Sequence, residues 1–542
     1  MTHSAPDPHT TPSVDLGDKS LAITAVSQQP GVSGKDSSGA YGQSSRRALL
    51  GLGGAAAVLA SAPEARAQAA QIPLAGGANT QYREDLGALI SRGTYGYKVG
   101  DLQLARQLGF SGWLDDQLNP VGIDDSALDA RLAQFPTLTM TGKQIYDTYS
   151  GTISLQQVPR RELREATLLR RTFSKRQLLE RVVEFWTDHF NIQINELKRD
   201  TVYLKPVEDR DVIRPLALGN FRDLLFASAH SAAMCAYLDN KDNKVGAPQE
   251  NYAREVMELH TIGVAGGYTE DDVRELARCF TGWNYFEQSS PVYGDFRFIA
   301  GNHDNGSKQV LGINIPAGGG VLDAETILEF LANSPQTAEY VSGKLTRYLL
   351  SYDPPQFVLD AVKNAWIASS GDIKTVIRAI LNPANLAAAD VFTKRKLKRP
   401  YHYVVSALRA MDADLVDTDL AIDELHILGH TPYDWGPPTG YPDTREAWVG
   451  GMWSRWRMAI DIPAGLATWC DVTPQLLALV LGSTPRSKWA LRIFRRLTGG
   501  WVSLNEVQKV QDYINANPQM PTSELAAEAY GLALLSPIFQ TY

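Results

Sequence analysis

Cysteine is scarce in this chain, with 3 among 542 residues. Three cysteines form at most one disulfide, so the protein is not a small scaffold held together by disulfides. No excess of basic charge is present either, because 52 Lys and Arg stand against 60 Asp and Glu, for a net charge of −8. A mildly acidic chain is a poor candidate for a general nucleic-acid-binding protein.

Long hydrophobic runs are missing as well. After residue 67, no apolar run approaches the length of about 18 residues that a transmembrane helix needs. We therefore expect the mature chain to have no stable membrane span. The composition, 44% hydrophobic and 21% charged, is that of an ordinary globular protein.

The first 67 residues are typical of an export signal. Residues 1–40 are rich in Ser, Gly, Pro and Thr, which indicates disorder. Arg46 and Arg47 then precede a short Gly/Ala-rich apolar stretch, which ends at a small-x-small cleavage pattern closing at Ala67. Together these features predict a twin-arginine signal peptide, with the twin-arginine machinery as a partner and a periplasmic or secreted location. An ordinary secretory signal is the alternative.

Helical patterns dominate the mature chain. We expect a linker over 68–84 and then a single domain over 85–540. Apolar residues from Leu178 to Phe190 recur at spacings of three and four, which predicts a helix with one buried stripe. Ser174 and Gln177 are placed for a capping box in front of it. Further helices are predicted over 101–118, 158–172, 210–232, 249–261, from Thr269 onward, and over 323–350, 355–367, 371–382, 398–412, 450–467, 472–482, 485–498, 503–515 and 522–535.

Strand patterns are few. Residues 295–299 and 309–315 alternate or are rich in β-branched residues, and Asp304-Asn305-Gly306 between them is a turn signal. This predicts a short β-hairpin inserted at about 294–316. The expected fold class is mainly α: a large multi-helix globular body with that hairpin and a Trp/Pro-rich loop at about 431–449.

Several motifs stand out along the domain: Phe185-Trp186 with His189-Phe190, Asn251 to Gly263, Gly267 to Val273, Phe280 to Trp283, His303-Asp304, Lys344-Leu345, and 535–540. The set resembles the bacterial family catalogued as domain of unknown function 1800. The resemblance implies an exported, mostly helical protein, whose gene often lies beside that of a second exported family similar to sulfatases and phosphatases. The family often has Asn where this chain has Asp188.

Histidines inside these motifs predict a metal site. Histidine and carboxylate are the usual ligands of zinc, iron, manganese and copper, so the candidate ligands are His189, His260, His303 and Asp304. Such a site would hold a divalent transition metal for hydrolysis or for redox chemistry. The alternatives are a metal-free acid–base site and a purely structural role, since a histidine on an apolar stripe is often a satisfied core residue.

The candidate catalytic residues follow from the same motif. Glu255 or Glu258 would act as general base, and Arg254 would stabilise developing negative charge. On a continuous α-helix, Glu258 and His260 lie about 200° apart, so both reach one ion only if the helix breaks there. The carboxylate face is equally consistent with an ion-paired network between helices.

Aromatic and basic residues gather near the C-terminal third. Trp435, Trp448 and Arg455 are candidate substrate-binding residues, because exposed Trp with polar neighbours suits stacking on sugar rings. Burial of the tryptophans beneath a Pro-rich loop is the alternative. The basic run 394–399 is typical of a solvated helix start, or could meet an acidic partner or polyanionic substrate.

Three functional hypotheses result. The first is an exported enzyme, either a metal-assisted hydrolase or an oxidoreductase. The second is a non-enzymatic partner or assembly factor for the exported sulfatase/phosphatase-like protein, and the third is a carbohydrate-binding scaffold. Convergence of the motif side chains on an open pocket would favour the enzyme.

Overall fold

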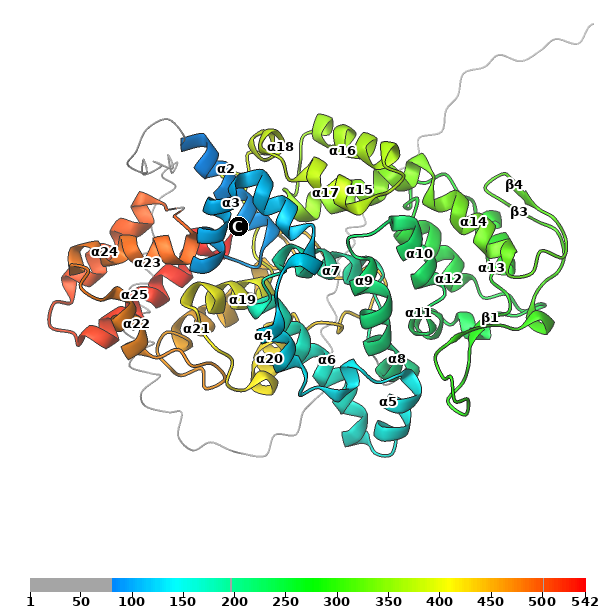
Figure 1. The fold of residues 1–542 in the computed structure, drawn as a ribbon, viewed down its shortest axis with the longest axis horizontal. Coiled ribbons are helices and arrows are strands. Elements are labelled where there is room, and N and C mark those ends of the chain that lie inside the picture. Colours follow the sequence, from blue (N-terminus) through cyan, green and yellow to red (C-terminus); the bar gives the residue numbers. More distant parts are fainter. Residues whose placement is uncertain (1–79, 195–196, 501) are drawn as a thin grey trace, which may run out of the picture. The chain divides into compact units, whose positions relative to one another are not determined.

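The computed structural model describes residues 80–194, 197–500 and 502–542. They belong to one compact unit and fold mainly into α-helices, as the sequence predicts (Figure 1). The predicted signal peptide, with Arg46, Arg47 and Ala67, lies outside the described residues. Within those residues, no helix is both long and apolar enough to cross a membrane.

Every stretch predicted as helix contains one, although 210–232 and 323–350 are divided between several. The helices of the first half are α2 (Thr80–Gly93), α3 (Val99–Gln117), α4 (Ser126–Leu132), α5 (Gly142–Tyr149), α6 (Ile153–Phe173), α7 (Gln177–His189), α8 (Asp200–Glu208), α9 (Arg214–Leu216), α10 (Phe221–Ala229), α11 (Ala232–Tyr237), α12 (Glu250–Glu255) and α13 (Glu270–Cys279). Those of the second half are α14 (Leu322–Ala332), α15 (Pro335–Leu349), α16 (Gln356–Ala368), α17 (Ile373–Ile380), α18 (Pro383–Ala388), α19 (Pro400–Met411), α20 (Thr418–Ile427), α21 (Met452–Asp461), α22 (Pro474–Leu481), α23 (Trp489–Thr498), α24 (Leu504–Ala516), α25 (Thr522–Leu535) and α26 (Pro537–Gln540).

Helix α7 runs through the core and carries the predicted stripe. Leu178, Val182, Trp186 and His189 are fully buried, and the Trp186 indole donates to the Ala217 carbonyl at 3.0 Å. Because the stripe recurs at helical spacing, the whole helix is fixed by packing on that side. The last turn of α7, with Asp188 and His189, is thereby held rigidly at the site described below.

The predicted capping box in front of α7 is wrong. Ser174 instead ends α6, and its hydroxyl accepts from the Arg176 amide at 2.9 Å while it contacts Asp125 Oδ2 at 2.5 Å. The Gln177 side chain accepts from the Tyr95 amide at 3.0 Å. Both polar side chains of the predicted capping box are therefore engaged in tertiary hydrogen bonds instead.

The strands form two small antiparallel sheets rather than the single predicted hairpin. β1 (Trp283–Tyr285) pairs with β2 (Phe296–Phe298), and β3 (Lys308–Val310) pairs with β4 (Ile313–Ile315). The β3–β4 turn is Leu311-Gly312, with φ of 51° and 78°. Positive φ at both central residues suits a two-residue hairpin turn, but a leucine there gives no signal in the sequence.

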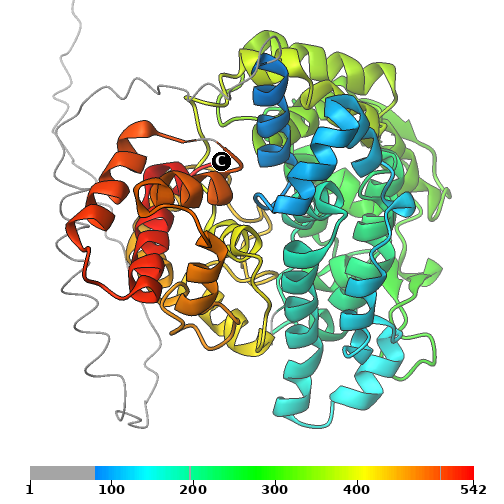
Figure 2. The same cartoon turned by 60° about the vertical axis from the view of Figure 1, so that its left-hand side comes forward.

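The C-terminal helices α21 to α25 pack together, with α25 in contact with each of the other four (Figure 2). The chain end beyond α26 pairs with the extended segment in front of α19: the Lys396 amide donates to the Tyr542 carbonyl at 3.2 Å, and the Lys398 amide donates to the Gln540 carbonyl at 2.9 Å. This pairing fixes the basic run 394–399 against the core.

Candidate functional site

Two of the four predicted metal ligands lie side by side. The rings of His189 and His260 are 6.0 Å apart between centroids, and both are buried. Helix α12 continues into a π-helical turn over Val256–His260. The wider π turn departs from the α-helical spacing assumed for this motif, and such turns are frequent at functional sites. It is the break in the helix that directs His260 toward His189.

The other two predicted ligands belong to a separate polar cluster. His303 contacts the Thr281 carbonyl through Nδ1 at 2.8 Å and Asp323 through Nε2 at 3.2 Å. Asp304 accepts from Arg278 Nε at 2.8 Å. Across the described ranges, no group of three or more His, Cys, Asp or Glu residues comes together in a way that could hold a metal ion. The structure therefore divides the four residues between two places.

Two of the three predicted catalytic residues, Arg254 and Glu258, join in one ion-paired network on α12 and its π turn, and Glu255 forms no salt bridge with a described residue. Arg254 bonds Glu270 at 2.7 Å, and it also reaches Glu250 at 3.3 Å and Glu258 at 3.5 Å. Glu255 is half-buried, and burial followed by repulsion from Glu258 raises its pKa. The arrangement is an ion-paired network that joins this helix to the start of α13.

A cleft of about 860 Å³ opens beside the histidine pair. Its size falls in the range of pockets that bind small molecules. Its walls come from the end of α7, the segment after the π turn, α15, α16 and the Trp/Pro-rich loop. The described lining residues are Phe185, Asp188, Ile262, Gly263, Val264, Ala265, Gln336, Glu339, Tyr340, Gly343, Lys344, Arg347, Tyr348, Gln356, Leu359, Asp360, Lys363, Arg399, Trp435, Thr439, Gly440, Tyr441, Pro442 and Asp443.

Lys344 of α15 connects this cleft to the histidine pair. Its Nζ lies 3.4 Å from His189 Nδ1, and His189 Nε2 lies 3.1 Å from the His260 carbonyl oxygen. A carbonyl only accepts, so His189 carries its proton on Nε2 and accepts from Lys344 through Nδ1. A directed chain of hydrogen bonds therefore runs from the cleft through Lys344 and His189 to the backbone carbonyl of His260. The imidazole of His260 lies beside this chain, and its Nε2 has no hydrogen-bond partner among the described residues.

Burial controls the protonation of this chain. Burial and the nearby Lys344 ammonium hold the pKa of His189 well below its usual value and lower the pKa of His260 to about 3. Burial also lowers the pKa of Lys344 to about 8, because the attraction of Asp188 only partly offsets it. Near neutral pH both imidazoles are neutral, and Lys344 is the group of the chain that exchanges a proton.

A network of buried charges supports the same wall of the cleft. Arg399 Nη1 bonds Asp188 at 2.6 Å, and Lys396 Nζ bonds Asp443 at 2.6 Å. Behind them, Glu184 is 2% exposed. Burial opposes its ionisation, but His402 and Arg171 outweigh that effect and hold its pKa well below the usual range. The partners of Glu184 are Tyr95, Tyr348, His402, Arg181, Arg171 and Arg399.

The predicted substrate-binding residues are dispersed. Trp435 is half-buried and lines the cleft, with its ring 5.0 Å from that of Tyr441. Trp448 is buried, and its indole donates to the Pro442 carbonyl at 2.8 Å, so it supports the loop from below. Arg455 is fully buried on α21, 3.3 Å from Gln540, and does not line the cleft.

Comparison with known proteins places the chain in a family. The family model described as "Protein of unknown function (DUF1800)" matches residues 88–541. The chain belongs to this family. No curated protein and no solved structure matches it. Its function therefore has to be argued from the geometry of the site, since neither the family description nor a related fold supplies a reaction.

Sequence reasoning about this DUF1800 chain missed the residues that surround the cleft most closely. Lys344 belongs to a family motif, but its position in the sequence relative to the motif histidines does not indicate that it contacts one of them. Lys396 and Arg399 lie in a basic run of the kind usually found in solvent, yet both are buried. One signal was present: α19 begins directly after that run and is mostly apolar, which favours burial of the helix together with the residues that lead into it.

Proposed function

We propose that this protein is an exported enzyme that cleaves an acidic saccharide chain by acid–base chemistry, with Lys344 as the group that transfers the proton. The observation that carries the proposal is the placement of Lys344. Its amine lies in the wall of the 860 Å³ cleft, against a neutral histidine, and it forms no salt bridge with any described residue. A lysine held this way is not needed as a structural ion pair, which frees its proton for chemistry.

The cleft suits a ligand with sugar rings and negative charge. Trp435 and Tyr441 form one wall, and aromatic faces stack on the apolar faces of sugar rings. Arg347 is exposed in the lining and, like Lys344, forms no salt bridge with a described residue. By contrast, Lys363 in the same lining is paired with Glu339 at 2.8 Å. The described lining holds four basic and four acidic side chains, and Lys344 and Arg347 are the basic residues that remain to bind an anionic substrate.

Lys344 can assist cleavage either by donating a proton or by removing one. As an ammonium it donates to the glycosidic oxygen that leaves when water adds to the sugar. As a free amine it removes the proton on the carbon beside a sugar carboxylate. The electron pair of that C–H bond forms a C=C bond, the glycosidic C–O bond breaks, and the Lys344 ammonium formed in the first step gives its proton to the leaving oxygen. A pKa near the working pH makes both forms available. His189 holds the amine in place through Nδ1.

The proposal places this chemistry outside the cytoplasm. Its support is the paired arginines Arg46 and Arg47 and the cleavage pattern that ends at Ala67. Replacing both arginines with lysine should leave the full-length precursor in the cytoplasm, whereas the unaltered chain should appear outside it and lack the leader. Export of the double variant at the normal level would contradict the twin-arginine route.

The decisive experiment is an activity assay with carboxylated, sulfated and neutral polysaccharide probes. Polygalacturonate, chondroitin sulfate and dextran are incubated with the mature chain. New reducing ends report any cleavage, and absorbance of an unsaturated product reports elimination. We expect cleavage of an anionic probe and none of dextran. Parallel reactions with a chelator, followed by added zinc or manganese, show whether the predicted divalent metal takes part.

The matched variants are Lys344→Met and Lys363→Met. Both remove a lysine from the same cleft, but Lys363 is paired at the rim, so its loss should leave turnover within about twofold. Lys344→Met should lower kcat by at least about 100-fold, the usual contribution of a general acid–base group. Equal activity of the two variants would overturn the assignment of Lys344, and absence of cleavage with all three probes would overturn the substrate class.

A separate surface favours the non-enzymatic alternative, a partner of an exported sulfatase/phosphatase-like protein. Trp453 of α21 is 67% exposed, and Trp456 and Val449 beside it are exposed as well. Exposed aromatic side chains of this kind often anchor protein interfaces. Trp453→Ser should abolish co-elution with that protein if this surface binds it, whereas Lys344→Met should not. Binding unaffected by Trp453→Ser would exclude this surface.

A further inference from the structure

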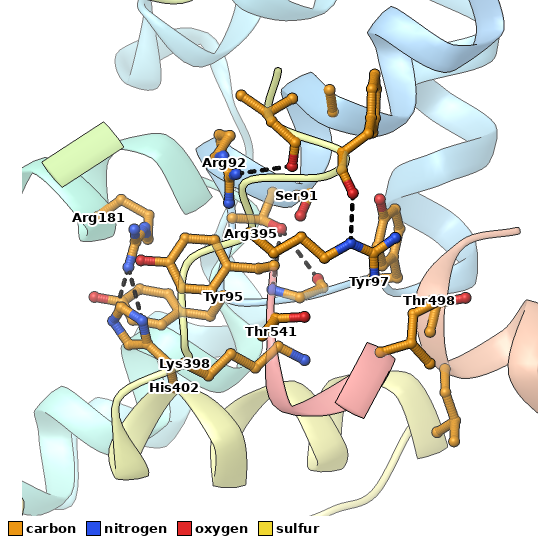
Figure 3. Close-up of a pocket in the computed structure, with 18 residues that line it drawn as sticks. Ser91, Arg92, Tyr95, Tyr97, Arg181, Arg395, Lys398, His402, Thr498 and Thr541 are labelled. Atoms are coloured by element: carbon orange, nitrogen blue, oxygen red, sulfur yellow. Dashed lines mark hydrogen bonds between the residues drawn. The ribbon is translucent and has the colours of Figure 1, made fainter. Parts of the chain in front are cut away.

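A second cavity, of about 50 Å³, lies between α2, α7, the segment in front of α19 and the chain end (Figure 3). It shares no described lining residue with the 860 Å³ cleft beside the histidine pair. Four of its described lining residues are Arg or Lys, namely Arg92, Arg181, Arg395 and Lys398, and none is Asp or Glu. When side chains with charges of the same sign meet in a small cavity, a compensating charge of the opposite sign is needed.

The two deepest arginines keep N–H groups without acceptors. Arg92 and Arg181 are each 1% exposed. In Arg92, Nε and Nη1 have no hydrogen-bond partner among the described residues, and in Arg181 the same holds for Nε and Nη2. The Tyr542 ring lies 5.0 Å from the Arg92 guanidinium and 5.5 Å from that of Arg181. Ring faces cover the planes of the guanidinium groups, but their N–H bonds lie within those planes and still need acceptors.

The remaining cations increase the deficit of negative charge. Lys398 is 7% exposed, and its amine lies over the Phe539 ring rather than against a carboxylate. Burial and the neighbouring Arg455 and Arg395 hold its pKa well below the usual value, so its ammonium form is disfavoured until an anion is bound beside it. Arg395 is half-buried at the rim, and its Nε donates only to the Phe392 carbonyl at 2.9 Å.

Nearby carboxylates offset only part of the charge of these four side chains, and one of them, Glu506, attracts Arg395 at the rim. Glu184 approaches Arg181 at 3.4 Å, but it also faces Arg171 and Arg399. Glu184 is thus shared by three arginines, of which Arg181 lines the cavity. Unpaired buried charge is strongly unfavourable, so a mobile anion is the simplest group that would satisfy it.

We propose that this cavity is a binding site for a small tetrahedral oxyanion, phosphate or sulfate. A single buried water needs roughly 10–15 Å³, so a cavity of about 50 Å³ has room for an ion of several heavy atoms. The unpartnered Nε and Nη2 of Arg181 form one edge of the guanidinium that can donate to two oxygens of such an ion, and Arg92 supplies its Nε and Nη1 as separate donors. Lys398 and Arg395 supply further donors. The anion joins α2, α7 and the chain end through one centre.

The test uses the mature chain dialysed into chloride buffer. Phosphate and sulfate are titrated separately in a calorimeter, and thermal melts are recorded at each anion concentration. We expect saturable one-to-one binding of at least one of the two, with a melting temperature that rises in parallel. The stronger of the two titrations identifies the ion. Absence of saturable binding by both would overturn the proposal.

Variants distinguish a built site from a general salt effect. Arg92→Gln and Lys398→Met should each weaken binding by roughly tenfold or more, because each removes a charged donor. Arg395→Gln at the half-buried rim tests the same point if a deeper replacement fails to fold. Lys394→Gln is the control, since Lys394 is exposed and absent from the described lining. Equal stabilisation of all four variants by the anions would show an unspecific effect and would contradict the site.

Discussion

Gly440 holds the Trp/Pro-rich loop against the end of α7, and its replacement by alanine should open the cleft. Gly440 has φ +72°, and a Cβ there would lie 2.0 Å from the Asp188 carbonyl oxygen, whereas real Cβ contacts essentially never fall under 3.0 Å. The loop would have to retreat by about 1 Å. Asn191 Nδ2 donates to the Trp435 and Pro437 carbonyls at 2.9 and 2.8 Å, and a shift of that size would break both bonds.

The expected cost of Gly440→Ala follows from these contacts. Left-handed backbone costs a non-glycine residue about 1–2 kcal/mol, and each lost hydrogen bond costs about 1 kcal/mol. We expect a total near 3 kcal/mol, with faster hydrogen exchange over 431–449 and weaker saccharide binding. Gly436→Ala in the same loop is the control, because its Cβ would meet Gln193 at an ordinary 3.6 Å. Equal behaviour of the two variants would refute the close approach as the cause.

Three further outcomes are expected. Glu184→Gln leaves buried arginines without their shared carboxylate and should lower the free energy of unfolding by about 3–5 kcal/mol, whereas Glu339→Gln at the exposed rim should change it by less than about 1 kcal/mol in the same thermal melts. Lys344 has its pKa lowered from 10.5 to about 8, so between these pH values the unfolded chain binds a proton that the folded chain has released. The contribution of Lys344 to the free energy of unfolding therefore rises between pH 8 and pH 10.5, by at most about 3 kcal/mol. Thermal melts recorded across this pH range should show the rise for the unaltered chain and not for Lys344→Met. Arg254→Ala breaks a partly exposed ion-paired network and should leave kcat within about threefold. A 100-fold loss of kcat would instead indicate that the α12 motif is catalytic.

The helices could be predicted because their buried stripes are local patterns. The apolar stripe of α7 predicts both the extent of this helix and the burial of His189. The pairing of β3 with β4 could not be predicted, because the turn between them depends on Leu311 in left-handed conformation. The capping residues in front of α7 were likewise decided by distant partners, Asp125 and Tyr95.

The candidate site could be predicted only in part. Of the motif histidines, His189 and His260 lie together and His303 lies elsewhere. The π turn at Val256–His260 decides which of them meet, and no residue in it signals a departure from α-helical geometry. Lys344 reaches His189 across 155 positions of sequence, a distance over which spacing carries no information. Burial of the basic run 394–399 follows from pairing with the chain end, which is again a non-local contact.

The central claim is that Lys344 is the reactive amine of the cleft. Its most direct test is the rate of amine labelling at each lysine as a function of pH, resolved by peptide mass spectrometry on the folded chain. We expect Lys344 to label with a midpoint near pH 8 and to be protected by an acidic oligosaccharide. Lys363, whose pKa is raised by its hydrogen bond to Glu339, should label only at higher pH and without protection. Labelling of Lys344 in step with Lys363 would contradict the account.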